Sequence, residues 1–103
     1  MENRRNTQRA AIIADIEVTE VVSGTRLSAR TSDVSITGCY VDTLNPTAAG
    51  TDIRVRLVHA GEELNVLARV VYLSPRLGMG IRFDESMVTA ERAILERWVA
   101  EPK

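Results

Sequence analysis

Cysteine and histidine, the residues that most often cross-link a chain or bind a metal ion, are nearly absent from this sequence. It contains one cysteine, Cys39, and one histidine, His59, among 103 residues. One cysteine cannot form a disulfide within the chain, and this pair is too few for the usual zinc sites. We therefore expect no metal and no cofactor, and a single domain held by an apolar core, which a chain of this length can bury.

Neither sign of charge dominates, and no hydrophobic run is long. The chain has 13 basic and 14 acidic residues, a balance that does not favour a broad nucleic-acid-binding surface or an enzyme for acidic substrates. No apolar run approaches the roughly 18 residues of a membrane-spanning helix, and the polar N-terminus is not a signal peptide. We therefore expect a soluble, cytoplasmic protein without membrane insertion.

Aromatic residues are also scarce, at 4% of the sequence. Small barrels that bind single-stranded nucleic acids stack the bases on exposed aromatic rings in a basic groove, so that class fits poorly and no nucleic-acid polymer is expected as a partner. An enzyme fits less well still. No pattern resembles a nucleophile–base pair, a metal site or a Walker-type phosphate loop, and we assign no catalytic residue.

Basic residues gather at the N-terminus. Residues 1–10, MENRRNTQRA, contain Arg4, Arg5 and Arg9 against one acidic residue, Glu2. With so few apolar side chains this segment is expected to be a flexible arm, followed by a folded domain over residues 11–103. Taken by itself, such a segment is more often a solvated tail than a binding site.

Six segments have the pattern of β-strands. Residues 11–22 alternate between apolar and polar side chains, as a half-buried strand does. Residues 52–59 alternate in the same way, with Arg54 and Arg56 on the polar face, where exposure to solvent is the ordinary interpretation. Turn residues separate the predicted strands, which cover residues 11–22, 25–33, 38–43, 52–59, 64–74 and 77–83.

The pattern changes near the C-terminus, where residues 85–101 show the periodicity of an amphipathic helix, with Asp84 or Ser86 as the expected N-cap. The apolar side chains of this helix are Met87, Ala90, Ile94, Leu95, Trp98 and Val99. Strands followed by one helix indicate an all-β barrel or sandwich, and a closed six-stranded antiparallel β-barrel with a C-terminal α-helix leaves no exposed edges. Because side chains fill so small a barrel, a ligand must bind on its outside.

Two short motifs are the most specific feature of the sequence. Arg5 and Arg9 form an RxxxR pattern. Asp33, Ser35 and Gly38 form a DxSxxG pattern within DVSITG. In this order and at this spacing they resemble the signature of the PilZ domain family, whose last strand is similar to LGMGIRFDE. The resemblance covers nearly the whole chain and implies a PilZ-type barrel that binds the bacterial second messenger cyclic di-GMP without catalysis.

The chemistry of these residues suits that ligand, which carries two phosphodiester groups and two guanine bases. An arginine can donate two hydrogen bonds to a phosphate and can stack on a purine. The Asp33 carboxylate can accept hydrogen bonds from the two neighbouring donors of a guanine edge, and Ser35 can hydrogen-bond a phosphate or a base. Gly38 can take a strained turn or let the ligand approach the backbone.

The resemblance also implies a stoichiometry, and the composition of the arm suggests a mode of signalling. In PilZ-like domains a basic residue at the position of Arg4 is associated with an intercalated ligand dimer, so two ligand molecules per chain are expected. Binding should order the arm. We expect no attached output domain, so a protein partner acting in trans should read the change.

Structural interpretations of the same residues stay open. Asp33 and Ser35 could form a turn that only reverses the chain, and the backbone could require Gly38 with or without a ligand. The protein would then be a ligand-independent interaction module of a motility or secretion system.

Three further residues are expected to play no part in binding. Cys39 should be a buried strand residue, because its neighbours are apolar or aromatic. His59 should be exposed beside a turn, and Trp98 should belong to the core.

Overall fold

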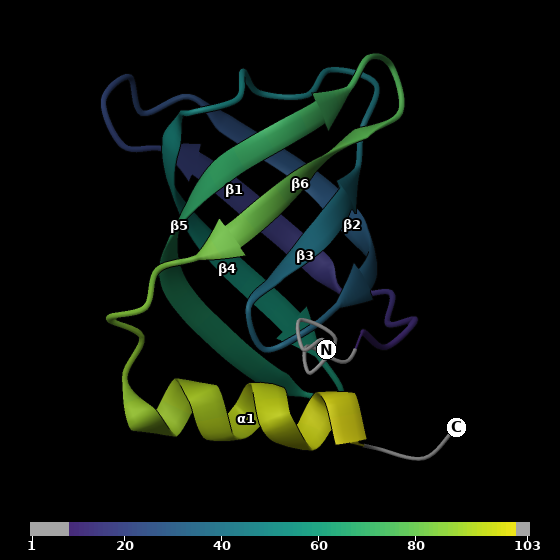
Figure 1. Ribbon diagram of the computed structural model, residues 1–103, viewed down its shortest axis with the longest axis vertical. Coiled ribbons are helices and arrows are strands. Elements are labelled where there is room, and N and C mark those ends of the chain that lie inside the picture. The colour runs from purple at the N-terminus through teal and green to yellow at the C-terminus, as the bar shows by residue number, and fades with distance from the viewer. Residues whose placement is uncertain (1–8, 101–103) are drawn as a thin grey trace, which may run out of the picture.

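The computed structural model describes residues 9–100. Figure 1 shows a barrel of strands with one helix lying across its lower end. The elements are, in chain order, β1 (Asp15–Glu20), β2 (Arg26–Val34), β3 (Gly38–Asp42), β4 (Asp52–His59), β5 (Glu62–Ser74), β6 (Gly78–Phe83) and α1 (Thr89–Ala100).

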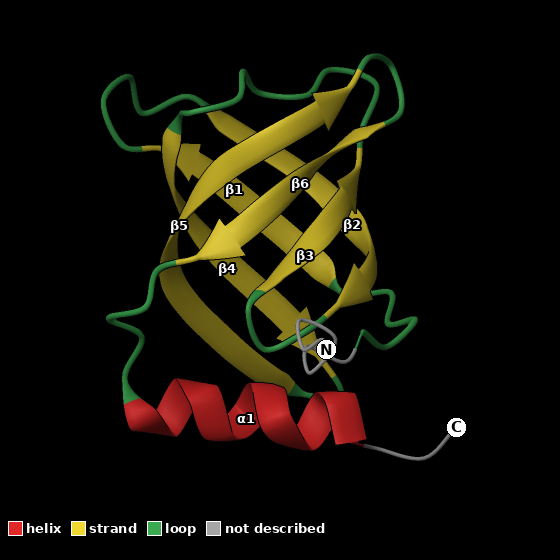
Figure 2. Ribbon diagram, viewed as in Figure 1, coloured by secondary structure: helices red, strands yellow, loops and turns green. Residues whose placement is uncertain are grey.

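The six strands form one closed sheet. Each strand runs antiparallel to its neighbours in the order β1-β2-β3-β6-β5-β4, and β4 pairs back with β1. Loops join the strands at the two ends of the barrel, and a further loop leads from β6 to α1 (Figure 2). The predicted six-stranded antiparallel barrel with a C-terminal helix is therefore confirmed.

Alternating side chains fill the barrel. In β4 the side chains of Ile53, Val55 and Leu57 are fully buried, while Arg54 and Arg56 between them are exposed, as predicted. The other strands contribute inward side chains in the same way, and the buried apolar residues form one cluster. Because this cluster occupies the interior, a ligand has room only on the outer surface.

Hydrogen bonds beside a β-bulge in β2 attach the segment that precedes β1 to the barrel. The register between β2 and β3 shifts between Thr31 and Asp33. Thr31 is 1% exposed. Its hydroxyl accepts a hydrogen bond from the Ala14 backbone N–H at 2.9 Å and donates one to the Ile12 carbonyl at 2.8 Å. These bonds hold residues 12–14 against β2 and satisfy a polar group that would otherwise be buried without a partner.

The helix begins later than predicted, at Thr89 rather than near residue 85. The Asp84 carboxylate accepts a hydrogen bond from the Ser86 backbone N–H at 2.8 Å and forms a turn ahead of the helix. This bond lowers the pKa of Asp84. In the first turn of the helix, the Val88 carbonyl accepts a hydrogen bond from the Glu91 N–H. Neither predicted N-cap residue therefore caps α1, because the Asp84 side chain is engaged in a local turn.

The C-terminal half of α1 packs against the barrel. Leu95, Trp98 and Val99 are buried, which confirms Trp98 as a core residue. Ala90, which was expected on the same face, is exposed because it lies in the first turn, ahead of the buried part of the helix. No helix within residues 9–100 has the length and hydropathy that crossing a membrane requires.

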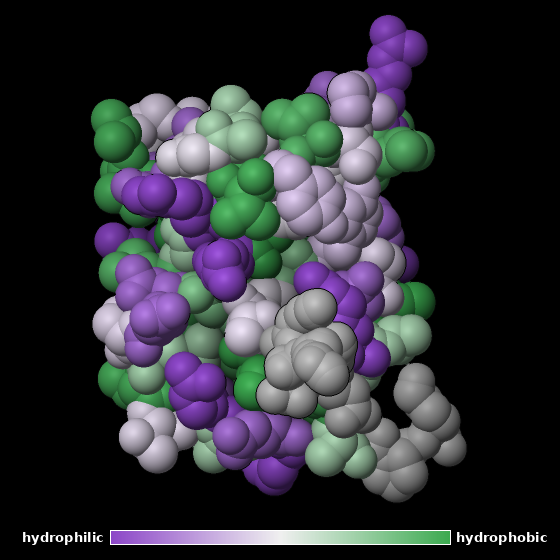
Figure 3. All heavy atoms as spheres, in the orientation of Figure 1, coloured by the Kyte–Doolittle hydropathy of each residue, from purple (hydrophilic) through white to green (hydrophobic). Residues whose placement is uncertain are grey.

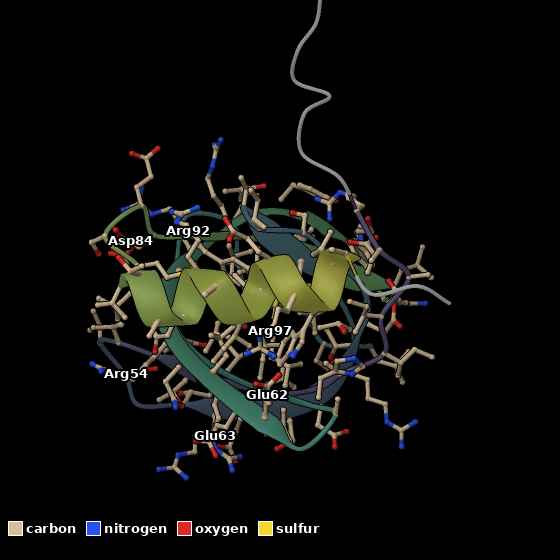
Figure 4. All side chains as sticks on the ribbon, turned by 90° about the horizontal axis from the view of Figure 1, so that it is seen from below. Arg54, Glu62, Glu63, Asp84, Arg92 and Arg97 are labelled. Atoms are coloured by element: carbon tan, nitrogen blue, oxygen red, sulfur yellow. The ribbon has the colours of Figure 1, made fainter. Side chains whose placement is uncertain are left out.

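A carboxylate on the β4–β5 hairpin holds the end of α1. Glu62 accepts hydrogen bonds from Arg97, at 3.0 and 2.7 Å, and from the Trp98 indole N–H, at 3.0 Å. Figure 4 shows Arg97 and Glu62 next to each other beside the helix. These bonds from Arg97 and Trp98 lower the pKa of Glu62. His59 packs edge-on against Trp98, with ring centroids 5.1 Å apart, and is half-buried, so its expected exposure is wrong.

Replacing Glu62 by alanine should loosen the end of α1. The variant lacks the acceptor of both Arg97 and Trp98, and it leaves the indole N–H without its partner. We expect a lower thermal midpoint and faster amide exchange in the last turns of α1. The matched control is Glu63→Ala, because Glu63 lies in the same hairpin but accepts from Arg56 and not from the helix. Equal exchange rates in α1 for the two variants would contradict the role of Glu62.

The same contact should depend on pH. Folding lowers the pKa of Glu62 below its ordinary value of 4.5. A carboxyl group of this kind stabilises the fold above its unfolded pKa, and the contribution is lost as the pH falls through the folded value. The difference in thermal midpoint between the wild type and Glu62→Ala should therefore be present at neutral pH and shrink below about pH 4.5.

Candidate ligand-binding site

The DxSxxG motif lies at the end of the barrel nearer α1. Asp33 is the residue before the last in β2, residues 35–37 turn the chain, and Gly38 begins β3. Figure 1 shows this β2–β3 connection at the lower end of the barrel, above the helix. The motif therefore occupies one hairpin on the outside of the barrel.

Arg9 and Asp33 are brought together across 24 positions of sequence. The Arg9 Nη1 atom donates a hydrogen bond to the Asp33 Oδ1 atom at 2.5 Å. The side chains are 48% and 33% exposed. The second carboxylate oxygen of Asp33 accepts no hydrogen bond from residues 9–100, so the pair keeps both donor and acceptor groups on the surface.

The backbone next to Arg9 is also paired with β2. The Ala10 N–H donates to the Val34 carbonyl at 2.9 Å, and the Val34 N–H donates to the Ala10 carbonyl at 3.0 Å. Arg9 and Ala10 were assigned to a free arm from the sequence, and the structure instead attaches both to the barrel. Arg4 and Arg5 lie outside the described residues.

The β-bulge is what turns Asp33 outward. In an unbroken strand, residues two apart point to the same face. Thr31 points into the barrel, and the extra residue at the bulge puts Asp33 on the opposite face and Val34 back into the core. Without this shift, the carboxylate of Asp33 would point towards the apolar interior.

Ser35 organises the turn between the two strands. Its side chain is fully buried. Its hydroxyl oxygen accepts hydrogen bonds from the backbone N–H groups of Thr37 and Gly38 and donates one to the Gly38 carbonyl, all at 3.2 Å. The structure thus places this hydroxyl inside the hairpin, where it fixes the path of the backbone beside Asp33.

Gly38 allows two strands to approach closely. A Cβ atom at this position would lie 2.0 Å from the Ile81 carbonyl oxygen of β6. The requirement is therefore steric, and no left-handed conformation is involved, since Gly38 is not among the residues with positive φ. Of the two roles that the sequence suggested, a strained turn is not observed, and close approach of another backbone explains the glycine.

The remaining chemically interesting side chains lie apart from this hairpin or are inert. Burial, with a smaller effect of the nearby Asp33 carboxylate, raises the pKa of the Cys39 thiol to about 12, so this cysteine is a packed core residue and no nucleophile. Arg54 and Arg56 lie on β4, which is flanked by β1 and β5. Within residues 9–100, no group of three His, Cys, Asp or Glu side chains could hold a metal ion.

Sequence reasoning overlooked Thr31, which positions both halves of the site. It holds residues 12–14 against β2, which places Arg9 near Asp33, and it occupies the inward position just before the bulge. The available signal was the spacing of three between the inward residues Thr31 and Val34, where regular alternation requires two.

Comparisons with known proteins agree with the fold. The model of the PilZ domain matches residues 3–101. Among solved structures, the PilZ domain of CeSA from a cellulose-synthesizing bacterium is 23% identical, with a TM-score of 0.71 over 90% of this chain and 95% of that one. The inhibitor of motility MotI/DgrA of Bacillus subtilis is 14% identical, with a TM-score of 0.77 over 95% of this chain. This chain spans 50% of the length of the Bacillus protein. At these identities the likeness concerns the fold, and no curated protein matches the sequence.

Substituting Gly38 by alanine should destabilise the protein strongly. The added methyl group meets a backbone carbonyl that cannot move without separating β3 from β6, so we expect a loss of about 2–3 kcal/mol in the free energy of unfolding. Gly50→Ala is the control, because Gly50 has φ of +91° but no atom within 4 Å of an added Cβ. It should cost only the backbone strain of about 1 kcal/mol. Urea unfolding followed by Trp98 fluorescence measures both, and a smaller loss for Gly38→Ala than for Gly50→Ala would refute the steric explanation.

Proposed function

Because the chain belongs to the PilZ domain family, a family of cyclic di-GMP receptors whose members are generally non-catalytic, we propose that it binds cyclic di-GMP as a second-messenger receptor. The observation that carries the proposal is the contact between Arg9 and Asp33. One residue from each motif stands at the same place on the barrel surface, as a shared ligand requires.

The pair can serve the two chemical parts of the ligand. Arg9 donates to Asp33 through Nη1, and its other N–H groups remain for a phosphodiester oxygen or for stacking on a guanine. The unused oxygen of Asp33 can accept from a guanine edge while the first one still holds Arg9. The ion pair therefore orients both side chains before the ligand arrives, which lowers the entropic cost of binding.

The other motif residues have distinct proposed roles. Arg4 and Arg5 supply further guanidinium groups for the phosphates and bases, and with Arg4 present we propose two ligand molecules per chain. Ser35 and Gly38 support the site through the hairpin: the hydroxyl fixes the turn, and the glycine sets the spacing to β6. No cofactor takes part in the proposed function.

Binding of this ligand should be sensitive to Arg9 and Asp33 in different ways. Arg9→Ala should abolish detectable binding, a loss of about a hundredfold or more, because it removes the guanidinium group that pairs with Asp33 and donates to the ligand. Asp33→Ala should weaken binding by about tenfold and reduce the preference over cyclic di-AMP and GMP, since the carboxylate reads the guanine edge. Arg26→Ala is the matched control, because Arg26 is exposed at the opposite end of β2.

Calorimetric titration of cyclic di-GMP into the purified chain measures these effects and the stoichiometry together. The expected result is saturation at two equivalents for the wild type and for Arg26→Ala. Normal binding by Arg9→Ala would refute the site, and saturation at one equivalent would refute only the ligand dimer.

We further propose that the ligand transmits its signal by ordering the arm for a protein partner that acts in trans. Arg9 already touches the barrel, so a ligand held there is well placed to recruit the arginines that precede it. Amide hydrogen exchange of residues 4–9 should slow by tenfold or more in the presence of saturating cyclic di-GMP. Unchanged exchange in these residues, with binding demonstrated in the same sample, would exclude the mechanism.

A ligand-independent interaction module is the second candidate, and the surface of the barrel supplies an observation in its favour. Leu44 and Leu77 are 75% and 69% exposed, and both belong to loops at the end of the barrel away from α1. Figure 3 shows hydrophobic side chains gathered towards this upper end of the molecule. Exposed apolar groups of this kind are typical of protein contacts. Absence of any heat or exchange change with cyclic di-GMP would favour this second candidate.

A further inference from the structure

The strand register places an arginine beside the DxSxxG hairpin that neither motif includes. Gly38 pairs with Arg82 of β6, and the Ser35 N–H donates to the Gly38 carbonyl on the other side. Ser35, Gly38 and Arg82 therefore form one row across three successive segments of the barrel wall. Residues paired in this way point to the same face of a sheet, and Arg82 is exposed on the outer one.

One strand, β3, separates Asp33 from Arg82: Tyr40 is the register partner of Asp33, and Gly38 is the register partner of Arg82. Gly38 carries no side chain, and the Ile81 carbonyl oxygen, 2.0 Å from where a Cβ atom would lie, prevents it from acquiring one. β2 and β6 are two strand spacings apart, roughly 10 Å. A cyclic dinucleotide, with two phosphates and two bases, can span that separation across the outer face of β3.

The aromatic side chains of the same outer face lie away from Gly38 and Arg82. Tyr40, the partner of Asp33 in the register, lies with its ring over Gly78, and the ring of Tyr72 lies over Gly80. Both glycines precede Arg82 along β6, on the side of the barrel away from the hairpin turn. The rings therefore cover the outer face up to Gly80, and the next outward position is Arg82.

The charges around Arg82 leave it available for an anion. Within the part of the chain that the structure describes, Arg82 makes no ion pair, whereas the charge of Arg9 is balanced by Asp33. Arg69, the cross-strand neighbour of Arg82 in β5, is paired with Asp52 at 2.9 Å. Asp84, two residues after Arg82, accepts from the Ser86 N–H, and the arginine that acts on its pKa is Arg69. Among the described residues around the hairpin, Arg82 thus keeps a positive charge that no ion pair balances.

We propose that Arg82 is an additional ligand-binding residue, which donates to a phosphodiester group of the dinucleotide held by Arg9 and Asp33. This inference rests on the proposed function. It extends the proposed site from the hairpin to β6. The phosphate would be bound by a side chain that projects from a hydrogen-bonded strand. A planar guanidinium suits this task because it can donate two parallel hydrogen bonds to a phosphate.

The test is a titration of cyclic di-GMP into the full chain and three variants, at two salt concentrations. Arg82→Ala should raise the dissociation constant by about tenfold or more, as expected for a lost hydrogen bond to a charged group. Arg82→Lys should recover part of the loss, because lysine keeps the charge without the fork. Arg54→Ala is the matched control: Arg54 is exposed on a strand, makes no ion pair within residues 9–100, and lies on β4 away from the hairpin. It should stay within about twofold of the wild type.

The outcomes separate this inference from the proposed function. Binding by Arg82→Ala within twofold of the wild type, when Arg9→Ala no longer binds, would remove Arg82 from the site and leave the receptor function standing. An equal loss of affinity for Arg82→Ala and Arg54→Ala would show that the effect comes from net charge alone, and it would also overturn the inference. A wild type that does not bind cyclic di-GMP would overturn both proposals. Thermal midpoints should be unchanged in all three variants, since each side chain is exposed, and a large decrease for Arg82→Ala would assign it to stability instead.

Discussion

The bulge in β2 is the constraint on which the rest of the site depends. One extra residue lets Thr31 face the core and Asp33 face solvent within the same strand. The buried threonine hydroxyl then ties residues 12–14 to β2, and that attachment carries the chain to the place where Arg9 can reach Asp33. A single backbone irregularity therefore fixes both the direction of the acidic group and the position of the basic one.

The residues of the DxSxxG motif have two different roles in the structure: Asp33 faces the surface, and Ser35 and Gly38 shape the hairpin. Asp33 is partly exposed, and one of its oxygens accepts no hydrogen bond from residues 9–100. Ser35 is fully buried with its hydroxyl committed to the turn, and Gly38 is required by the carbonyl of the facing strand. The hydrogen bonds of Ser35 fix the backbone of the hairpin beside Asp33, and a fixed backbone at a candidate site reduces the ordering that a ligand must impose.

Side-chain periodicity predicted the strands and the helix but left a barrel and a sandwich open, and the argument against exposed edges and the family resemblance favoured the barrel. Periodicity failed where local hydrogen bonds override it. The alternation around Ile53, Val55 and Leu57 identified a strand with the correct inner face, since burial decides that pattern. The start of α1 was placed too early, because the polar residues before it serve a turn centred on Asp84. The RxxxR and DxSxxG motifs indicated a candidate site, but the pattern could not reveal that the Ser35 hydroxyl is buried within the turn, where it accepts from the backbone N–H groups of Thr37 and Gly38.

Closure of the sheet limits how another protein can engage this barrel. Each of the six strands has a neighbour on both sides, so within residues 9–100 the backbone of the sheet offers no free ladder to which a foreign strand could add. Recognition must then be made by side chains and by segments outside the sheet. A binding protein would accordingly be selected by outward-facing residues, which can be substituted without disturbing the inward-facing core.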